Sequence, residues 1–160
     1  MAKFFGAIRE RLERIKQLDE NALFNEILIQ KEVQHFILEL NRSGQLWQGL
    51  DAMGLELDGY SPFTENLLEG DRANRFSYEG KSKSKRAGEP VFFFDTGEFY
   101  ESFSIKIEKT RFFIVADTVK ETQDLLNFGE ILGLSDESME KVIEVFRAKL
   151  LPLVRAHVLQ

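Results

Sequence analysis

The spacing of apolar residues changes along this chain of 160 residues, and that change limits the folds open to it. Within 3–40 and 139–154, apolar residues recur at steps of three and four, which is typical of amphipathic helices. Between these segments, Phe103, Ile105 and Ile107 alternate with polar residues, as in a half-buried strand. The pattern predicts an α+β protein with N-terminal helices, a small antiparallel sheet with a β-hairpin, and a C-terminal amphipathic helix.

Two helices are predicted in the N-terminal part, over 3–18 and 21–40. They are separated at 19–21, where two residue types that favour helix N-caps occur. Asn41-Arg42-Ser43 has the form of a glycosylation sequon, but we interpret it as the end of the second helix. Gly44 is then expected to act as a left-handed cap.

The C-terminal part is also predicted to be mainly helical. A helix over 119–128 is expected to end at Gly129. The long terminal helix begins after Ser135, an N-cap residue type followed by two acids that suit the positive end of a helix dipole. Pro152 is expected to kink or break this helix.

The middle of the chain is predicted to be less regular. Periodicity fades over 44–90, and Gly80 to Gly88 form a flexible basic loop without core residues. Val91 to Phe94 fit a short buried strand, followed by a helical turn over 98–102 and a hairpin over 103–116. We therefore expect one domain over 1–160 with a helical part (1–43), an irregular part (44–90) and a strand, hairpin and C-terminal helix part (91–160).

Composition argues against several kinds of site. Cysteine is absent, which removes thiol nucleophiles and thiolate metal sites. The two histidines, His35 and His157, have no metal-ligand spacing, so no metal and no cofactor is predicted. No apolar stretch is long enough to cross a bilayer and no signal peptide is visible, so we expect no membrane contact. Nucleotide-binding and nucleophile-elbow motifs are also missing, so the chain is not expected to be an enzyme.

Four basic residues lie close together in a chain whose formal charge is −6: Lys81, Lys83, Lys85 and Arg86. This cluster has three interpretations. It is a solvated flexible loop, a set of cations that contacts DNA phosphates, or a segment that becomes ordered against an acidic neighbouring subunit.

Asp95-Thr96-Gly97 follows three phenylalanines and has the form that begins the active site of a retroviral-type aspartic protease. In such homodimers two aspartates share a proton and activate water. Glu98 places a bulky charge where a small residue is usual, and the predicted helix content does not suit that class. The alternative is that Asp95 caps the next turn through backbone N–H groups. An intracellular protein-binding module is a further alternative.

Two segments resemble tailed-bacteriophage virion-morphogenesis and tail-completion proteins. Residues 94–103 (FDTGEFYESF) resemble the family segment in which a Thr-Gly pair is followed by an apolar residue and a serine. Residues 128–137 (FGEILGLSDE) resemble its Gly-Leu-Ser element, which precedes an amphipathic helix. The two segments occur in the family's order and are separated by a hairpin.

The resemblance implies a structural protein of the virion that forms a homo-oligomeric ring at the head-tail junction or tail end. Its partners would be itself and other phage neck, portal or tail proteins, with a passing contact to DNA in the channel, and it would be synthesised in the host cytoplasm. The matching residues would set turns and helix starts: Asp95, Thr96, Gly97, Phe99, Ser102, Phe128, Gly133, Leu134 and Ser135. We also expect Phe103, Ile105 and Ile107 of the hairpin to contribute to a subunit interface.

Overall fold

The computed structural model describes residues 2–69, 74–120 and 123–159, without the side chains of residues 2–8, 69, 120 and 123. The apolar side chains predicted for the first helix at Phe4, Phe5 and Ile8 therefore lie outside the described side chains. Over the described ranges the fold is α+β, as predicted. Its helices are α1 (Ala2–Lys16), α2 (Glu20–Leu28), α3 (Lys31–Arg42), α4 (Pro62–Glu69), α5 (Glu98–Glu101) and α6 (Asp136–Leu159), with short 3-10 helices η1 (Leu46–Gln48) and η2 (Leu125–Phe128).

The described strands form antiparallel pairs rather than one sheet. The pairs are β1 (Phe76–Tyr78) with β2 (Lys81–Lys83), β3 (Ser104–Glu108) with β4 (Arg111–Val115), and β5 (Val119–Lys120) with β6 (Gln123–Asp124). In the β3–β4 hairpin, Ile105 faces Ile114 and Ile107 faces Phe112, which confirms the predicted hairpin. Two-residue loops close the first two hairpins, with positive φ at Glu79, Gly80 and Lys109.

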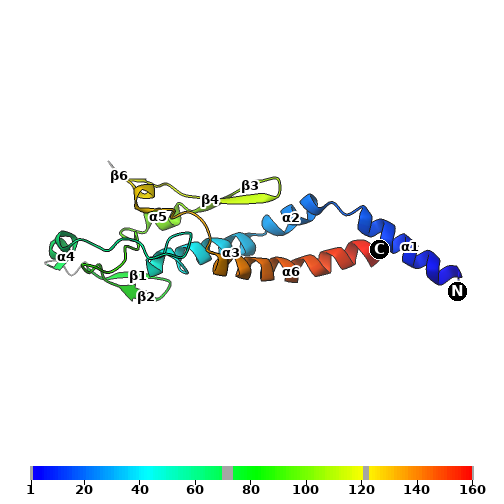
Figure 1. Cartoon of the computed structure of the whole chain (residues 1–160), viewed down its shortest axis with the longest axis horizontal. Helices are drawn as coiled ribbons and strands as arrows, with labels where there is room; N and C mark the ends of the chain where they lie inside the picture. The colour runs from blue at the N-terminus through cyan, green and yellow to red at the C-terminus, as the bar shows by residue number, and fades with distance from the viewer. Residues whose placement is uncertain (1, 70–73, 121–122, 160) are drawn as a thin grey trace.

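The molecule is elongated (Figure 1). The 24-residue helix α6 runs beside α2 and α3, and a helix of that length spans about 36 Å. Helix α1 lies at one end of the molecule, beside the C-terminal end of α6, and α4 lies at the other end (Figure 1). Among the residues described, no helix is both long and apolar enough to cross a membrane.

The N-terminal helices differ from the prediction in two respects. The chain does turn at Asp19, whose carboxylate accepts hydrogen bonds from the N–H groups of Asn21 (2.9 Å) and Ala22 (3.1 Å). However, the predicted helix over 21–40 is two helices, because Gln30 is extended, with ψ of 122°. Lys149 of α6 binds the side chains of Gln30 and Glu32 across this break, each at 2.6 Å. Gly44 is not a left-handed cap, since the residue after α3 is Ser43 in right-handed geometry.

Two further elements were predicted wrongly. Residues 91–94 are buried in part but form no strand, because Phe93 has a φ of +47°, which turns the chain out of an extended path. Residues 119–128 form β5, β6 and η2 instead of a helix, with 121–122 outside the described residues. The β-branched residues Thr118 and Val119 at its start favour extended backbone.

Helix α6 begins as predicted. The Ser135 hydroxyl accepts a hydrogen bond from the N–H of Ser138 at 3.4 Å, and Asp136 and Glu137 occupy the first turn. The helix continues through Pro152 to Leu159, so the predicted break does not occur. A single missing N–H donor removes one backbone hydrogen bond and does not end the helix here.

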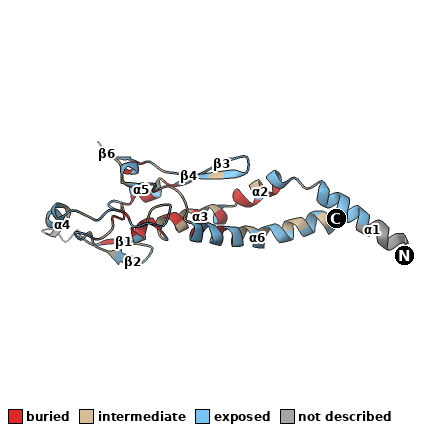
Figure 2. Cartoon of the chain, viewed as in Figure 1, coloured by how far each residue is buried: buried red, intermediate tan, exposed pale blue. Residues whose placement is uncertain are grey.

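Buried residues gather where α2, α3 and α5 meet the start of α6, while α4 and the described side chains of α1 are largely exposed (Figure 2). The main core joins apolar side chains from these four helices, among them Ile27, Ile37, Tyr100 and Val142. A second, aromatic cluster consists of Trp47, Phe76 and Phe92. The core therefore lies near the middle of the molecule, and few of the described residues at its two ends are buried.

Candidate functional site

The Asp95-Thr96-Gly97 loop starts helix α5, and Gly97 is the residue that permits the turn. Gly97 is the N-cap of α5 with a φ of +94°, a conformation that L side chains rarely adopt. The Thr96 hydroxyl accepts a hydrogen bond from the N–H of Glu98 at 3.4 Å. The cap therefore comes from Thr96, and the prediction that Asp95 caps this turn was wrong.

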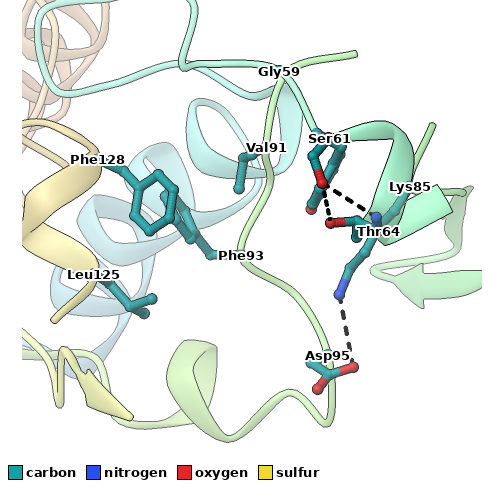
Figure 3. Close-up of a pocket in the computed structure, with 10 residues that line it drawn as sticks. Gly59, Ser61, Thr64, Lys85, Val91, Phe93, Asp95, Leu125 and Phe128 are labelled. Atoms are coloured by element: carbon teal, nitrogen blue, oxygen red, sulfur yellow. Dashed lines mark hydrogen bonds and ion pairs between the residues drawn. The ribbon is translucent and has the colours of Figure 1, made fainter. Parts of the chain in front are cut away.

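The Asp95 carboxylate instead forms an ion pair with Lys85, with 3.7 Å between Oδ1 and Nζ. The Asp95 side chain is 65% exposed, whereas the Lys85 side chain is 13% exposed. The pair lies at the rim of a hollow of about 510 Å³, which also carries the hydroxyls of Ser61 and Thr64 (Figure 3).

Helix α5 connects this loop to the core and to the hairpin. Phe99 and Tyr100 are both buried. The Ser102 hydroxyl donates to the carbonyl of Phe99 at 2.7 Å and accepts from the N–H of Asp117 at 2.9 Å. This hydroxyl therefore fixes the end of α5 to the chain that leaves β4, a structural contact for a residue of the resemblance.

The segment before α6 is held by two polar side chains from α3 and the turn after it. Asn41 is fully buried, and its Nδ2 donates to the carbonyls of Ile131 (3.2 Å) and Gly133 (2.6 Å). The Gln45 Oε1 accepts from the N–H of Ser135 at 3.1 Å. Neither contact was predicted from the sequence, although Asn41 lies four residues after Ile37 on the apolar side of α3, where a buried amide needs hydrogen-bond partners. Asn41 of the sequon therefore has a structural role, because it binds the segment that precedes α6.

The remaining residues of that segment also have packing contacts. A Cβ at Gly133 would lie 2.9 Å from the Cβ of Ala52, so the chain passes too close for a side chain. Leu134 is half-buried against the main core. Phe128 packs edge-on against Phe93, with 5.3 Å between ring centroids. Because Phe93 immediately precedes the first segment, the two segments of the resemblance meet at this contact and line the same hollow (Figure 3).

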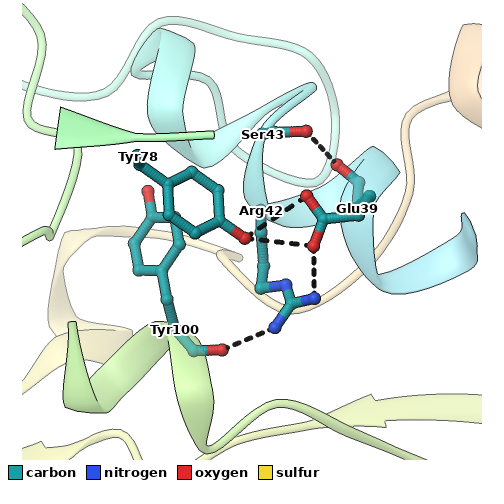
Figure 4. A network of polar contacts seen from close by, with 5 residues as sticks. All are labelled: Glu39, Arg42, Ser43, Tyr78 and Tyr100. Atoms are coloured by element: carbon teal, nitrogen blue, oxygen red, sulfur yellow. Dashed lines mark hydrogen bonds and ion pairs between the residues drawn. The ribbon is translucent and has the colours of Figure 1, made fainter. Parts of the chain in front are cut away.

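A polar network joins α3 to the β1–β2 hairpin and to α5 (Figure 4). Glu39 forms an ion pair with Arg42 and accepts a hydrogen bond from the Tyr78 hydroxyl at 3.0 Å. Arg42 also donates to the carbonyl of Tyr100 at 2.9 Å, and Tyr100 donates to the carbonyl of Phe92 at 2.7 Å. The network fixes three elements that are distant in sequence.

Burial raises the pKa of every tyrosine in the chain. The pKa of Tyr60 is raised to about 12, with nearby Asp95 adding to the effect of burial. Those of Tyr78 and Tyr100 lie higher still, mainly through burial, while the nearby Arg42 guanidinium lowers both. The hydroxyls therefore stay protonated: those of Tyr78 and Tyr100 donate hydrogen bonds, and that of Tyr60 accepts one from the N–H of Phe92 at 3.2 Å.

The basic cluster is more ordered than the sequence predicted. Lys81, Lys83 and the residue between them form β2, which corrects the prediction of a flexible loop over 80–88. The Lys83 ammonium donates to the carbonyl of Trp47 at 3.1 Å, and burial lowers its pKa. Lys85 lies over the Phe76 ring, 4.3 Å from the centroid, in addition to its pair with Asp95. Only Lys81 and Arg86 of the four are exposed.

A shallow basic hollow of about 380 Å³ lies on this side of the molecule. Its lining residues are Arg75, Ser82, Lys83, Ser84, Arg86 and Glu89. Three cations and two hydroxyls in one place suit an anion such as a phosphate, and Glu89 lowers the net positive charge.

The hairpin residues predicted to form an interface lie on its inner face. Phe103 is 5% exposed and belongs to the core, which corrects the prediction for that residue. Ile105 and Ile107 are half-buried and pack against the core. The exposed apolar side chains of the hairpin are instead Phe113 and Val115 on β4.

Within the described ranges, no group of three His, Asp or Glu residues is arranged to hold a metal ion. His35 lies on α3 and His157 on α6, in the helical positions that the sequence predicted. In comparisons with known proteins, no family model, no curated protein and no solved structure matches this chain.

Proposed function

We propose that this chain is a structural subunit of a tailed-phage virion that closes as a homo-oligomeric ring in the neck or at the tail end. Its partners there would be portal, neck or tail proteins. The two segments that resemble tail-completion proteins support this role, because Thr96, Gly97, Ser102 and Ser135 make structural contacts that set turns and helix starts.

The observation that carries the proposal is the placement of exposed apolar side chains at the two ends of the molecule. Leu12 and Ile15 of α1 are 52% and 46% exposed, and Phe63 and Leu67 of α4 are 72% and 67% exposed. Helix α1 and helix α4 lie at opposite ends (Figure 1). Large exposed apolar side chains at different places on one chain suit heterologous contacts between copies, which close into rings.

The proposal assigns no catalysis to Asp95. A shared-proton dyad depends on two carboxylates held close together, so that only one of them ionises. The Asp95 side chain is 65% exposed and forms an ion pair with the Lys85 ammonium at 3.7 Å, so it is neither enclosed nor placed for pairing with a second carboxylate. These contacts support a structural role for the Asp-Thr-Gly loop.

A passing contact with DNA would use the basic hollow. Exposed Arg86, with Arg75 beside it, offers guanidinium groups that suit phosphate oxygens, and Ser82 and Ser84 offer hydroxyl donors. Such contacts position a nucleic acid without reading its sequence.

The experiment that tests the proposal measures the mass of the purified protein by light scattering over a concentration series. Negative-stain microscopy then shows the shape of any oligomer, and sedimentation with virions or isolated tails shows association. Closed rings that sediment with particles are expected. A protein that stays monomeric and does not sediment with any virion component would refute the proposal and favour the protein-binding module.

A further inference from the structure

We infer that helix α1 of one copy of this chain docks on the exposed face of helix α4 of a second copy. The inference rests on the self-association in the proposed function and names the surfaces that make it. The occupant of the α4 face is therefore a second copy of the chain, bound through its N-terminal helix.

The donor surface is one side of α1. Leu12 and Ile15 are three residues apart, so they lie on one side of the helix, and both are about half exposed. All described side chains of α1, from Arg9 to Lys16, are exposed. Helix α1 lies beside the end of α6 and is coloured as exposed where its side chains are described (Figure 2).

The acceptor surface is the outer side of α4. Phe63 and Leu67 are four residues apart and therefore adjacent on the helix surface. They are more exposed than any other large apolar side chain among the residues described. The helix is positioned by its first turn, in which the Ser61 hydroxyl accepts from the N–H of Thr64 at 3.2 Å. It is also tied to the basic segment by the Glu65 carboxylate, which accepts from the N–H of Ala87 at 2.9 Å.

The two surfaces have opposite charge, and this selects the occupant. In the described part of α1, Arg9, Arg11, Arg14 and Lys16 outnumber Glu10 and Glu13. By contrast, helix α4 contains Glu65 and Glu69 and no Lys or Arg. A basic helix with an apolar side complements an acidic segment with an apolar helix face. Two copies of α1 would repel each other, as would two copies of α4.

The position of the two helices makes this contact intermolecular. Because α1 and α4 lie at opposite ends of the elongated molecule, one chain cannot bring them together (Figure 1). Each copy therefore presents one α1 surface and one α4 surface for binding to other copies, which is a head-to-tail arrangement.

The test uses the absence of cysteine, which makes single-cysteine variants unambiguous. Leu12→Cys and Phe63→Cys are prepared separately, mixed in equal amounts and oxidised under mild conditions. A disulfide-linked dimer is expected in the mixture and not with either variant alone. Ile29→Cys is the matched control, since Ile29 is 62% exposed but belongs to the C-cap of α2 and not to α1 or α4, and its mixture with Phe63→Cys should not crosslink.

The outcomes separate this contact from the proposed function. Crosslinking of Leu12→Cys with itself would overturn the inference in favour of an α1–α1 contact. Oligomers by light scattering without a crosslink in the mixture would overturn the α1–α4 contact and leave the ring proposal standing. A crosslink in a protein that does not associate with virions would support the contact and refute the phage role.

Discussion

Replacing Asn41 by alanine is expected to destabilise the protein more than any other single loss of a hydrogen bond described above. Asn41 is fully buried, and its amide group satisfies the carbonyls of Ile131 and Gly133 at 3.2 and 2.6 Å. Alanine leaves both carbonyls without that donor in a place from which water is excluded. Each buried unsatisfied group costs about 1–3 kcal/mol.

The expected loss is about 2–3 kcal/mol, at the lower side of the sum of two such groups. Two features of the structure reduce it. Gln45 Nε2 lies 3.4 Å from the carbonyl of Gly133 and provides a weak second donor. The Asn41 Oδ1 itself has no hydrogen-bond partner among the described residues, so the substitution also removes one unpaired acceptor.

Urea unfolding followed by far-ultraviolet circular dichroism measures this loss. With a slope of about 2 kcal/mol per molar urea, the midpoint should fall by about 1–1.5 M. Gln48→Ala is the matched control, because Gln48 Nε2 donates to the carbonyl of Ser43 at 3.3 Å in an exposed position. Its loss should stay within about 0.5 kcal/mol. Equal midpoints for the two variants would refute the role given to Asn41.

Four further outcomes are expected. Near-ultraviolet absorbance should show no tyrosinate at pH 10 while the protein is folded, because burial raises all three tyrosine pKa values above the unfolded value of 10.0, and that of Tyr60 to about 12. The free energy of unfolding should therefore keep its full value below pH 10 and fall between pH 10 and 12. Early ionisation in the folded state would contradict the burial of the tyrosines. Gly97→Ala should lower the free energy of unfolding by about 1–2 kcal/mol in a thermal melt, because the φ of +94° penalises a side chain, and an unchanged melting temperature would contradict this cause. If the protein binds duplex DNA at low ionic strength, Arg75→Ala with Arg86→Ala should reduce the slope of log affinity against log salt by about 2, because both line the basic hollow. No binding by the unmodified protein at low salt would exclude the phosphate contact. Asp95→Asn should leave the protein folded and change no peptide cleavage, whereas a cleavage activity that this variant abolishes would establish the protease.

Several patterns formed by neighbouring residues led to correct predictions. The period of three and four predicted α1 and α6, and the period of two predicted the β3–β4 hairpin. Ile105 and Ile107, which were expected at a subunit interface, pack against the core of their own chain. Ser135 was identified as an N-cap because its hydroxyl acts only three residues away, on the N–H of Ser138. These signals are local, so the rest of the fold does not change them.

Features set by contacts between distant residues could not be read in this way. The break at Gln30 carries no glycine or proline and is stabilised by Lys149, more than a hundred residues away. From the sequence, the lysines of the basic cluster are expected in a solvated loop, yet the Lys83 ammonium donates a hydrogen bond to the carbonyl of Trp47. The site was likewise predicted only in part: the two segments of the resemblance were identified, but not that Phe93 and Phe128 bring them together.

The aromatic cluster around Trp47 gives the protein a built-in optical reporter. Trp47 is the only tryptophan in the chain and lies 5.1 Å from Phe92, 5.4 Å from Phe94 and 5.7 Å from Tyr78, between ring centroids. Its emission therefore reports the part of the molecule around η1 and β1, while the helical signal is dominated by α6 and its neighbours. Coincident fluorescence and dichroism transitions would show that both parts unfold as one cooperative unit. A fluorescence transition that precedes the dichroism transition would show that the part around η1 and β1 unfolds first, and ligands or partners that order it would then be visible as a change in a single emission band.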